Sequence, residues 1–321
     1  MPPSTPASLP APSQCRAVVV GGGTMGADIA VVLLRASCQT TVVEPDTGRH
    51  AGILARVDEN LAAAGAQQNA VRLALVAGLD DAHWQDVDLV IECIPEKLPP
   101  KQALFAELVK RAPAHATLAS NSSSFPISAI GQGLPTRERM LGLHFFMPAH
   151  LVPLVEVVLS EAADPRLGDA LAAFMRRCGM VPVLVRKDVP GFLANRLQHA
   201  LGREAFALIQ EGVASPEDVD AAVRFGFGFR YLAAGPLLQR DHAGLEVHCA
   251  AAATMYPTLS NATEPPPVLT ERVQAGHYGM KAGQGFYRWD EASIAAERAR
   301  YERLLRAGLA LIAEELPRID P

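Results

Sequence analysis

Two spacings of apolar residues alternate along the first half of the chain. Short β-branched runs such as AVVV, TTVV, DLVIECI and LVEVVL are separated by segments in which apolar residues return every three or four positions, as on one face of a helix. Short strands that alternate with helices are typical of a doubly wound sheet. Strands are expected at residues 17–20, 40–45, 88–94, 116–121, 142–146, 154–159 and 180–185, and helices at residues 25–36, 48–75 and 101–111.

The alternation stops near residue 187, and only helical spacing continues beyond it. Asp188 is expected to cap the first of these helices, with Pro190 in its first turn, and Ser215 is expected to cap the next one. The sequence therefore predicts a Pro/Ser/Ala-rich disordered tail over residues 1–14, an α/β domain over residues 15–187 and an all-α C-terminal domain over residues 188–321.

The composition is that of an ordinary globular protein and argues against several classes of function. Of 321 residues, 49% are hydrophobic and 20% are charged, unlike disordered or fibrous chains. The 29 Lys and Arg against 34 Asp and Glu give a net charge of −5, which leaves no basic surplus to bind nucleic acid or an anionic membrane. No run reaches the roughly 18 to 20 apolar residues that a membrane span needs.

The cysteines and the start of the chain indicate a reducing compartment. Five widely spaced cysteines form no C-x-x-C pair and no His/Cys cluster at zinc spacing, so reduced thiols and no metal site are expected. The first residues lack the basic start and the apolar core of a secretory signal. We therefore expect a cytoplasmic protein.

The turn after the first predicted strand carries a phosphate-binding pattern. It reads Gly21-Gly22-Gly23-Thr24-Met25-Gly26, a G-x-G-x-x-G that follows a strand and opens a helix. The first glycine permits the tight turn, the second lets the backbone approach a pyrophosphate, and the third lets the helix pack closely on the strand. The helix N-terminus faces the anion. Together with the alternation of strands and helices, this pattern predicts a Rossmann-like doubly wound sheet.

The second predicted strand ends at Glu44, about where an acid meets the 2'-hydroxyl of an adenosine ribose. A carboxylate there would repel a 2'-phosphate, which favours NAD over NADP, although Arg49 lies five residues on and could partly offset it. The cofactor-binding residues predicted from this segment are Gly21, Gly23, Thr24, Met25, Gly26 and Glu44.

Three features in the middle of the chain indicate chemistry: the serines of SNSSS, His144 in a strand and Glu156 within the run LVEVVL. A carboxylate in an apolar run is expected to be buried, and its burial is costly unless it is paired. His144 is the expected partner, because a Glu bonded to one imidazole nitrogen fixes the tautomer and raises the basicity of the other. Such a base suits removal of an alcohol proton. A histidine that only packs in the core, and serines that only cap or lie on the surface, are the alternatives.

From about residue 16 to residue 287 the chain resembles the L-3-hydroxyacyl-CoA dehydrogenases. The motifs GGGTMG, DLVIECIPEKLPPK, ASNSSSFPI, GLHFFMPAHLVPLVEVV, KDVPGFLANR and MKAGQGFY occur in the order and spacing of that family. The resemblance implies a catalytic dyad at His144 and Glu156, a contact from Ser123 to the substrate oxygen, and an Asn195 that orients the substrate. It also implies cofactor contacts from Glu96, Lys101, Ser123 and Lys281.

Two departures from the family pattern bear on cofactor and substrate. Where the family usually has Asn in H-F-F-N-P, this chain has Met147, which can donate no hydrogen bond beside the nicotinamide. The family's acyl-CoA members also carry a long, Lys-rich helical hairpin after the second strand, whereas residues 48–78 of this chain hold three Arg and no Lys. A polyphosphate would find few partners there.

The C-terminal half also resembles a sister branch, the lambda-crystallin, gulonate and carnitine dehydrogenases, through LANRLQHAL, EGVASPEDVD and GFGFRYLAAGPLLQRD. This branch acts on free small acids, and an arginine fork matches a carboxylate. Arg230 is the candidate substrate contact, with Arg196 and Arg240 behind it, and a structural ion pair is the alternative role. A CoA thioester and a free acid both remain open as substrates.

Two further classes were compared with this interpretation. The β-hydroxyacid dehydrogenases need a lysine in the helix that joins the domains, and PGFLANRLQHALGREAF has none. An NAD-binding structural protein with little turnover is the non-enzymatic alternative. The sequence thus predicts an NAD-dependent dehydrogenase that interconverts a 3-hydroxyacyl substrate and its 3-oxo form, acts on a small molecule, and forms a homodimer through its C-terminal helices.

Overall fold

The computed structural model describes residues 8–321, and its contacts divide them into two compact units. The first unit runs to Asn195 and also includes Glu314–Pro321, whereas the second is Arg196–Ala313. Residues 1–7 of the predicted tail lie outside the described residues. The sequence placed the change of domain near residue 188, at the last strand, while the contacts of the structure change inside the helix that follows.

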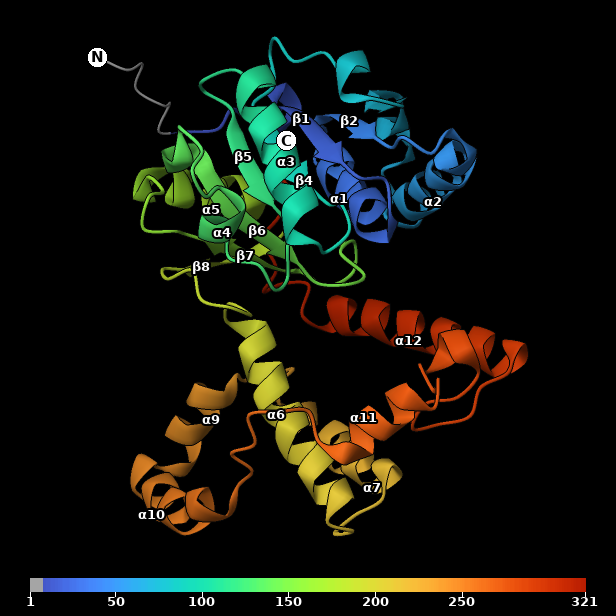
Figure 1. Cartoon of the computed structure of the whole chain (residues 1–321), viewed down its shortest axis with the longest axis vertical. Helices are drawn as coiled ribbons and strands as arrows, with labels where there is room; N and C mark the ends of the chain where they lie inside the picture. The colour runs from blue at the N-terminus through green and yellow to red at the C-terminus, as the bar shows by residue number, and fades with distance from the viewer. Residues whose placement is uncertain (1–7) are drawn as a thin grey trace. The chain divides into compact units, whose positions relative to one another are not determined.

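The first unit is built on a sheet of eight strands in the order β3-β2-β1-β4-β5-β6-β7-β8 (Figure 1). Neighbouring strands are parallel except β6 and β7, which are antiparallel. The strands are β1 Arg16–Val20, β2 Gln39–Val43, β3 Leu73–Val76, β4 Leu89–Glu92, β5 Thr117–Ser120, β6 Met140–Phe145, β7 Leu154–Val158 and β8 Val181–Val185. The chain leaves β1 first toward β2 and later toward β4, so the topology is doubly wound, as predicted. Open sheets of this kind bind ligands at the carboxyl ends of the strands, where the order reverses.

Helices pack on both faces of this sheet (Figure 1). The helices are α1 Thr24–Arg35, α2 His50–Ala63, α3 Leu98–Arg111, α4 Ile127–Ile130 and α5 Pro165–Arg177. Buried residues of α1, α2 and α5 share one hydrophobic cluster with Val19, whereas those of α3 and α4 share another with Val18 and Val20. Successive residues of a strand point to opposite faces, so a strand covered on both sides is apolar throughout. This explains the continuous AVVV run.

The second unit has only helices as its regular elements, which confirms the predicted all-α C-terminal part. They are α6 Ala194–Gln210, which begins in the first unit, α7 Pro216–Ala221, α8 Gly228–Arg230, α9 Pro236–Ala243, α10 Leu245–Met255, α11 Pro267–Gln274 and α12 Glu291–Leu311. Ser215 caps α7 as predicted, since its hydroxyl accepts a hydrogen bond from the amide of Asp218 at 3.1 Å. Within residues 8–321, no helix is both long enough and apolar enough to span a membrane.

The helix predicted over residues 48–75 is wrong in its second half. The helix α2 ends at Ala63, and Gly65 follows in the left-handed region at φ +68°. A helical turn over Gln67–Arg72 then leads into β3, whose sequence LALV pairs with β2 at the sheet edge. These leucines and alanines favour a helix by propensity, and pairing with the β-branched strand β2 overrides that preference.

Two other expectations near the ends of the first unit differ from the structure. Asp188 does not cap α6, because Gly191 at φ +77° and Phe192 at φ +49° interrupt the chain before the helix begins at Ala194. The carboxylate of Asp188 instead accepts a hydrogen bond from the amide of Ser128 at 2.8 Å. In the part of the predicted tail that the structure describes, Leu9 packs against the core, so this segment is ordered.

Candidate active site

The glycine turn between β1 and α1 leaves one position open to a ligand. A Cβ on Gly21 would lie 2.7 Å from the carbonyl oxygen of Cys93, and a Cβ on Gly26 would collide with the carbonyl oxygen of Gly21. The nearest atom to a Cβ on Gly23 is 3.9 Å away, on Arg49. Gly23 is also the N-cap of α1 and provides no side-chain cap, so the first amides of the helix face this open position. Such an arrangement fits the pyrophosphate of a dinucleotide.

Glu44 lies directly after β2 and holds the glycine turn. Its Oε2 accepts a hydrogen bond from the amide of Gly22 at 3.0 Å and lies 3.2 Å from Nη1 of Arg49. Arg49 was expected only to offset the charge of Glu44, but the structure also puts its guanidinium beside the open position at Gly23. A contact from Glu44 to the ribose, and from Thr24 and Met25 to the phosphates, remains a prediction.

His144 and Glu156 lie opposite each other in the antiparallel pair β6 and β7. Directly opposed residues place their side chains on the same face of the sheet. Nδ1 of His144 lies 2.7 Å from Oε2 of Glu156, and both side chains are buried. The pairing expected from the sequence is therefore present. With the proton of the imidazole on Nδ1, the lone pair of Nε2 is left for a ligand.

The second oxygen of Glu156 is held by the backbone at the start of α6. Oε1 accepts hydrogen bonds from the amides of Leu193 at 3.0 Å and Ala194 at 2.8 Å. Burial alone would raise the pKa of Glu156, but the hydrogen bonds from His144 and these amides outweigh burial, and the pKa lies below its ordinary value. The carboxylate is therefore charged at neutral pH and fixed at both oxygens. No pattern in the sequence indicated that these two amides would bind Glu156.

Two aromatic rings restrict the imidazole. The ring of Phe146 meets it edge-on at a centroid distance of 4.5 Å, and the ring of Phe192 lies at 5.6 Å. These contacts limit rotation of His144 and reduce its access to water. Met147 follows Phe146 and is 67% exposed, so it contributes apolar surface where an amide would offer a donor.

The serine loop after β5 wraps around the carboxylate of Glu96. Oε1 of Glu96 accepts hydrogen bonds from the hydroxyls of Ser122 and Ser124, at 2.6 and 2.7 Å, and from the amides of Ser123 and Ser124. Burial opposes its charge, but these hydrogen bonds and the ammonium of Lys101 outweigh burial and lower the pKa of Glu96 to about 2. The hydroxyls of Ser122 and Ser124 thus bind within the loop itself.

Beneath this loop lies a buried ion pair that the sequence analysis missed. Nζ of Lys101 lies 2.7 Å from Oε1 of Glu92, 3.2 Å from Oε2 of Glu96 and 3.2 Å from the carbonyl oxygen of Ile94. These three partners account for its three donors, so Lys101 holds Glu96 in place, and its direct contact with a cofactor remains a prediction. The signal was present, since Glu92 stands in the apolar run DLVIECI just as Glu156 stands in LVEVVL.

Ser123 differs from its neighbours because its hydroxyl forms no hydrogen bond within the described residues. Its side chain is exposed, and its carbonyl oxygen accepts a hydrogen bond from Nδ2 of Asn195 at 3.4 Å. The first unit therefore brings Ser123 and Asn195 together and also pairs His144 with Glu156. The serine loop begins at the carboxyl end of β5, and His144 lies in β6, which is the adjacent strand of the sheet.

Two of the predicted contact residues, Arg230 and Lys281, lie in the second unit. Arg230 lines a pocket of about 330 Å³ together with Phe227, Tyr231, Gln239 and Arg240. Nη1 of Arg240 lies 3.1 Å from Nδ1 of His248. Lys281 places its ammonium 5.5 Å from the centroid of the Tyr278 ring. The roles of Arg230 toward substrate and Lys281 toward cofactor remain predictions.

Comparison with known proteins accounts for both units. The NAD binding domain of 3-hydroxyacyl-CoA dehydrogenase matches residues 16–189, and the C-terminal domain of the same family matches residues 191–289. The chain is 32% identical over 285 residues to a probable 3-hydroxybutyryl-CoA dehydrogenase of Bacillus subtilis. This alignment covers 85% of this chain and 97% of the relative.

A second relative carries a different substrate name. The chain is 33% identical over 294 residues to the 5-formyl-3-hydroxy-2-methylpyridine 4-carboxylate 5-dehydrogenase of Mesorhizobium japonicum, covering 88% of this chain and 94% of the relative. A solved structure of a dehydrogenase of that name, described as an NAD+-dependent dismutase, matches with a TM-score of 0.88 at 30% identity over 93% of this chain and 98% of the other. The chain therefore belongs to the 3-hydroxyacyl-CoA dehydrogenase family and is an NAD-dependent oxidoreductase that interconverts a hydroxyl and a carbonyl group.

Proposed function

We propose that this enzyme oxidises a hydroxyl group β to a carboxylate, with His144 as the base, and that its substrate is a free, compact acid instead of a CoA thioester. The observation that carries the base assignment is the position of Glu156. One carboxylate oxygen binds Nδ1 of His144 and the other binds two backbone amides, so the imidazole is presented with Nε2 unpaired.

Each residue of the dyad has a defined task in proton transfer. Nε2 of His144 takes the proton of the substrate hydroxyl, and the carboxylate of Glu156 stabilises the imidazolium that results. Bound NAD+ supplies the hydride acceptor. In the reverse direction the imidazolium returns the proton to the oxygen of the 3-oxo group. The rings of Phe146 and Phe192 keep water from competing for Nε2.

The neighbouring polar groups are assigned to orientation. The exposed hydroxyl of Ser123 donates to the substrate oxygen, and the amide of Asn195 beside it holds the substrate near the start of α6. Arg230 is the proposed partner of the substrate carboxylate, because its planar fork matches two oxygens and the pocket that it lines is partly aromatic.

The substrate class is argued from the segment after β2, where a CoA nucleotide would need cations. This segment carries three arginines and no lysine. Arg49 is paired with Glu44, and Arg56 lies 2.7 Å from the buried carboxylate of Asp28. Two of the three guanidiniums are therefore already neutralised by the protein. The relative from Mesorhizobium is named for a free pyridine carboxylate, which supports the same substrate class.

We also propose that the enzyme is a cytoplasmic homodimer joined through its second unit. No residue from Leu193 to the end of the chain is buried, and large apolar side chains such as Phe225, Phe229 and Leu237 are at least 70% exposed. A helical unit of this size normally needs a buried core to be stable. Contact with a second copy would supply that core, and sedimentation equilibrium at several concentrations tests it.

The experiment for the catalytic proposal follows NADH absorbance with two sets of substrates, acetoacetyl-CoA and a panel of free 3-oxo acids. The His144→Gln variant is the control, and we expect it to keep NADH affinity but to lose at least about 100-fold in kcat. Turnover of a free acid alone, dependent on His144, is the expected result. Turnover of the thioester alone would overturn the substrate class and leave the dyad intact, whereas wild-type turnover by His144→Gln would overturn the dyad.

A further inference from the structure

Arg35, the last residue of α1, carries a charge that the described residues do not neutralise. Its guanidinium contacts only neutral atoms: the carbonyl oxygens of His150 and Cys178 at 3.4 and 3.5 Å, and the sulfur of Met180 at 3.3 Å. Nε is buried and donates no hydrogen bond. Burial lowers the pKa of Arg35 from its ordinary value. A guanidinium with long contacts and one unused donor is costly to bury unless an anion joins it.

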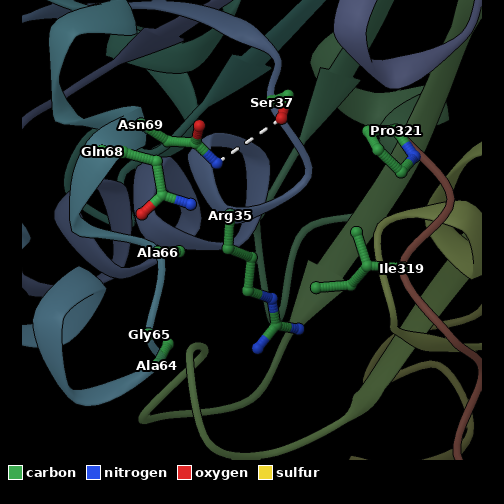
Figure 2. Close-up of a pocket in the computed structure, with 9 residues that line it drawn as sticks. All are labelled: Arg35, Ser37, Ala64, Gly65, Ala66, Gln68, Asn69, Ile319 and Pro321. Carbon is green, nitrogen blue, oxygen red and sulfur yellow. Dashed lines mark hydrogen bonds between the residues drawn. The ribbon is translucent and has the colours of Figure 1, made fainter.

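This guanidinium points into a pocket of about 460 Å³ within the first unit (Figure 2). The pocket is lined by residues at the end of α1 and in the segment after α2, and by the C-terminal segment that includes Ile319. Figure 2 shows Ser37 and Asn69 at one wall, where the amide of Asn69 lies 3.5 Å from the Ser37 hydroxyl. The amide of Gln68 lies beside them.

The chemistry of the lining selects the charge of a ligand. Arg35, Ser37, Gln68 and Asn69 supply hydrogen-bond donors, and no Asp or Glu side chain lines the pocket. Pro321 also lines the pocket, but its terminal carboxylate forms no ion pair with Arg35. The volume suits a small molecule. We propose that this pocket is a second ligand site, which binds a small oxyanion, a carboxylate or a phosphate, through the guanidinium of Arg35.

The site is separate from the active site. The helix α1 begins at the glycine turn and ends at Arg35, so its 12 residues separate the two ends by about 18 Å. Ser37 lies in the loop that leads into the start of β2, at the end of the sheet opposite to the carboxyl ends of the parallel strands. An anion in this pocket therefore does not occupy the dinucleotide or the His144 site.

The test measures binding of inorganic phosphate and of citrate by calorimetry, on enzyme saturated with NADH so that the dinucleotide site is filled. Arg35→Gln removes the charge, and Asn69→Asp places a negative charge on the wall without altering Arg35. Gln67→Glu adds the same charge one residue outside the lining and is the matched control. The expected result is binding by the wild type that weakens about 10-fold or more in Arg35→Gln and Asn69→Asp but not in Gln67→Glu.

The variant on the wall keeps the test decisive if Arg35→Gln fails to fold. Equal affinities in Asn69→Asp and Gln67→Glu would overturn the proposal, because the anion would then bind elsewhere, for example at the arginines of the second unit. The absence of binding of either anion to the wild type in the millimolar range would also overturn it. Turnover in phosphate-free buffer is expected to be the same in Asn69→Asp as in the wild type.

Discussion

The carboxylate of Glu156 joins the imidazole of His144 to the first turn of α6, since it lies 2.7 Å from Nδ1 and accepts the amides of Leu193 and Ala194. We expect Glu156→Gln to lower kcat by about 100-fold or more while the affinity for NADH stays the same. An amide cannot offset the charge of an imidazolium, and its NH2 group can turn toward Nδ1 and invert the tautomer. Steady-state kinetics and NADH titration measure the two quantities.

The control for this change is Glu161→Gln, which removes a carboxylate from an exposed turn beyond β7. It is expected to leave kcat unchanged. If Glu156→Gln retained the wild-type kcat, the carboxylate would have only a structural role. If both variants lost activity equally, the loss would follow net charge instead of the dyad.

The two glycines at the start of α1 are expected to respond differently to a methyl group. Gly26→Ala forces a Cβ into the carbonyl of Gly21 and should cost about 1–3 kcal/mol of stability. Gly23→Ala meets no atom closer than 3.9 Å and should cost no more than about 1 kcal/mol, because Ala is a poorer N-cap residue than Gly. Its methyl group would instead occupy the space proposed for the pyrophosphate, so NADH affinity should fall about 10-fold or more.

Urea denaturation and NADH fluorescence titration separate these effects. The opposite pattern, with Gly23→Ala unstable and still binding NADH normally, would contradict the assignment of the open position to the cofactor.

The sheet could be predicted because its strands are covered on both faces and are therefore apolar and β-branched. The strand β3 escaped prediction because it lies at the edge of the sheet and its LALV sequence carries no β-branched run to distinguish it from the helix before it. The start of α6 escaped for a different reason. Asp188 and Pro190 form a good helix start locally, but the positive φ of Phe192 is set by tertiary packing beside His144.

The site shows the same division between local and tertiary information. His144 and Glu156 could be paired because a carboxylate in a buried strand demands a partner. The same argument applied to Glu92 at the end of β4, but its partner Lys101 lies in the helix α3, and no spacing rule links the two residues. The pocket at Arg35 depends on three segments far apart in the sequence, so no local pattern marks it.

The buried pair of Lys101 and Glu92 should behave as one unit in stability measurements. Lys101→Met leaves the carboxylate of Glu92 buried without a counter-charge and should lower the free energy of unfolding by about 3–5 kcal/mol. The double variant Glu92→Gln/Lys101→Met removes both charges and should recover much of this loss. Lys110→Met breaks an exposed pair with Glu107 and should cost less than about 1 kcal/mol.

The double-mutant cycle decides between coupling and simple packing. The cycle also needs the single variant Glu92→Gln. If the losses of stability in Glu92→Gln and Lys101→Met added up to that of the double variant, the two charges would not act on each other, contrary to the 2.7 Å distance between them.

Glu96 should make part of the stability depend on pH in the acid range. Its pKa in the folded protein is about 2, because hydrogen bonds from the serine loop and the charge of Lys101 outweigh burial, while its ordinary value is 4.5. A depressed pKa contributes stability that is fully present above about pH 4.5 and is lost as the pH falls toward 2. Glu96→Gln removes this contribution, so the difference in stability between wild type and variant should be constant above pH 4.5 and should shrink below it. Urea midpoints measured across this range test the expectation, and Glu59→Gln, at an exposed position, is the control. If the difference in stability between wild type and Glu96→Gln stayed constant down to pH 3, the serine loop would not hold Glu96 in its charged form.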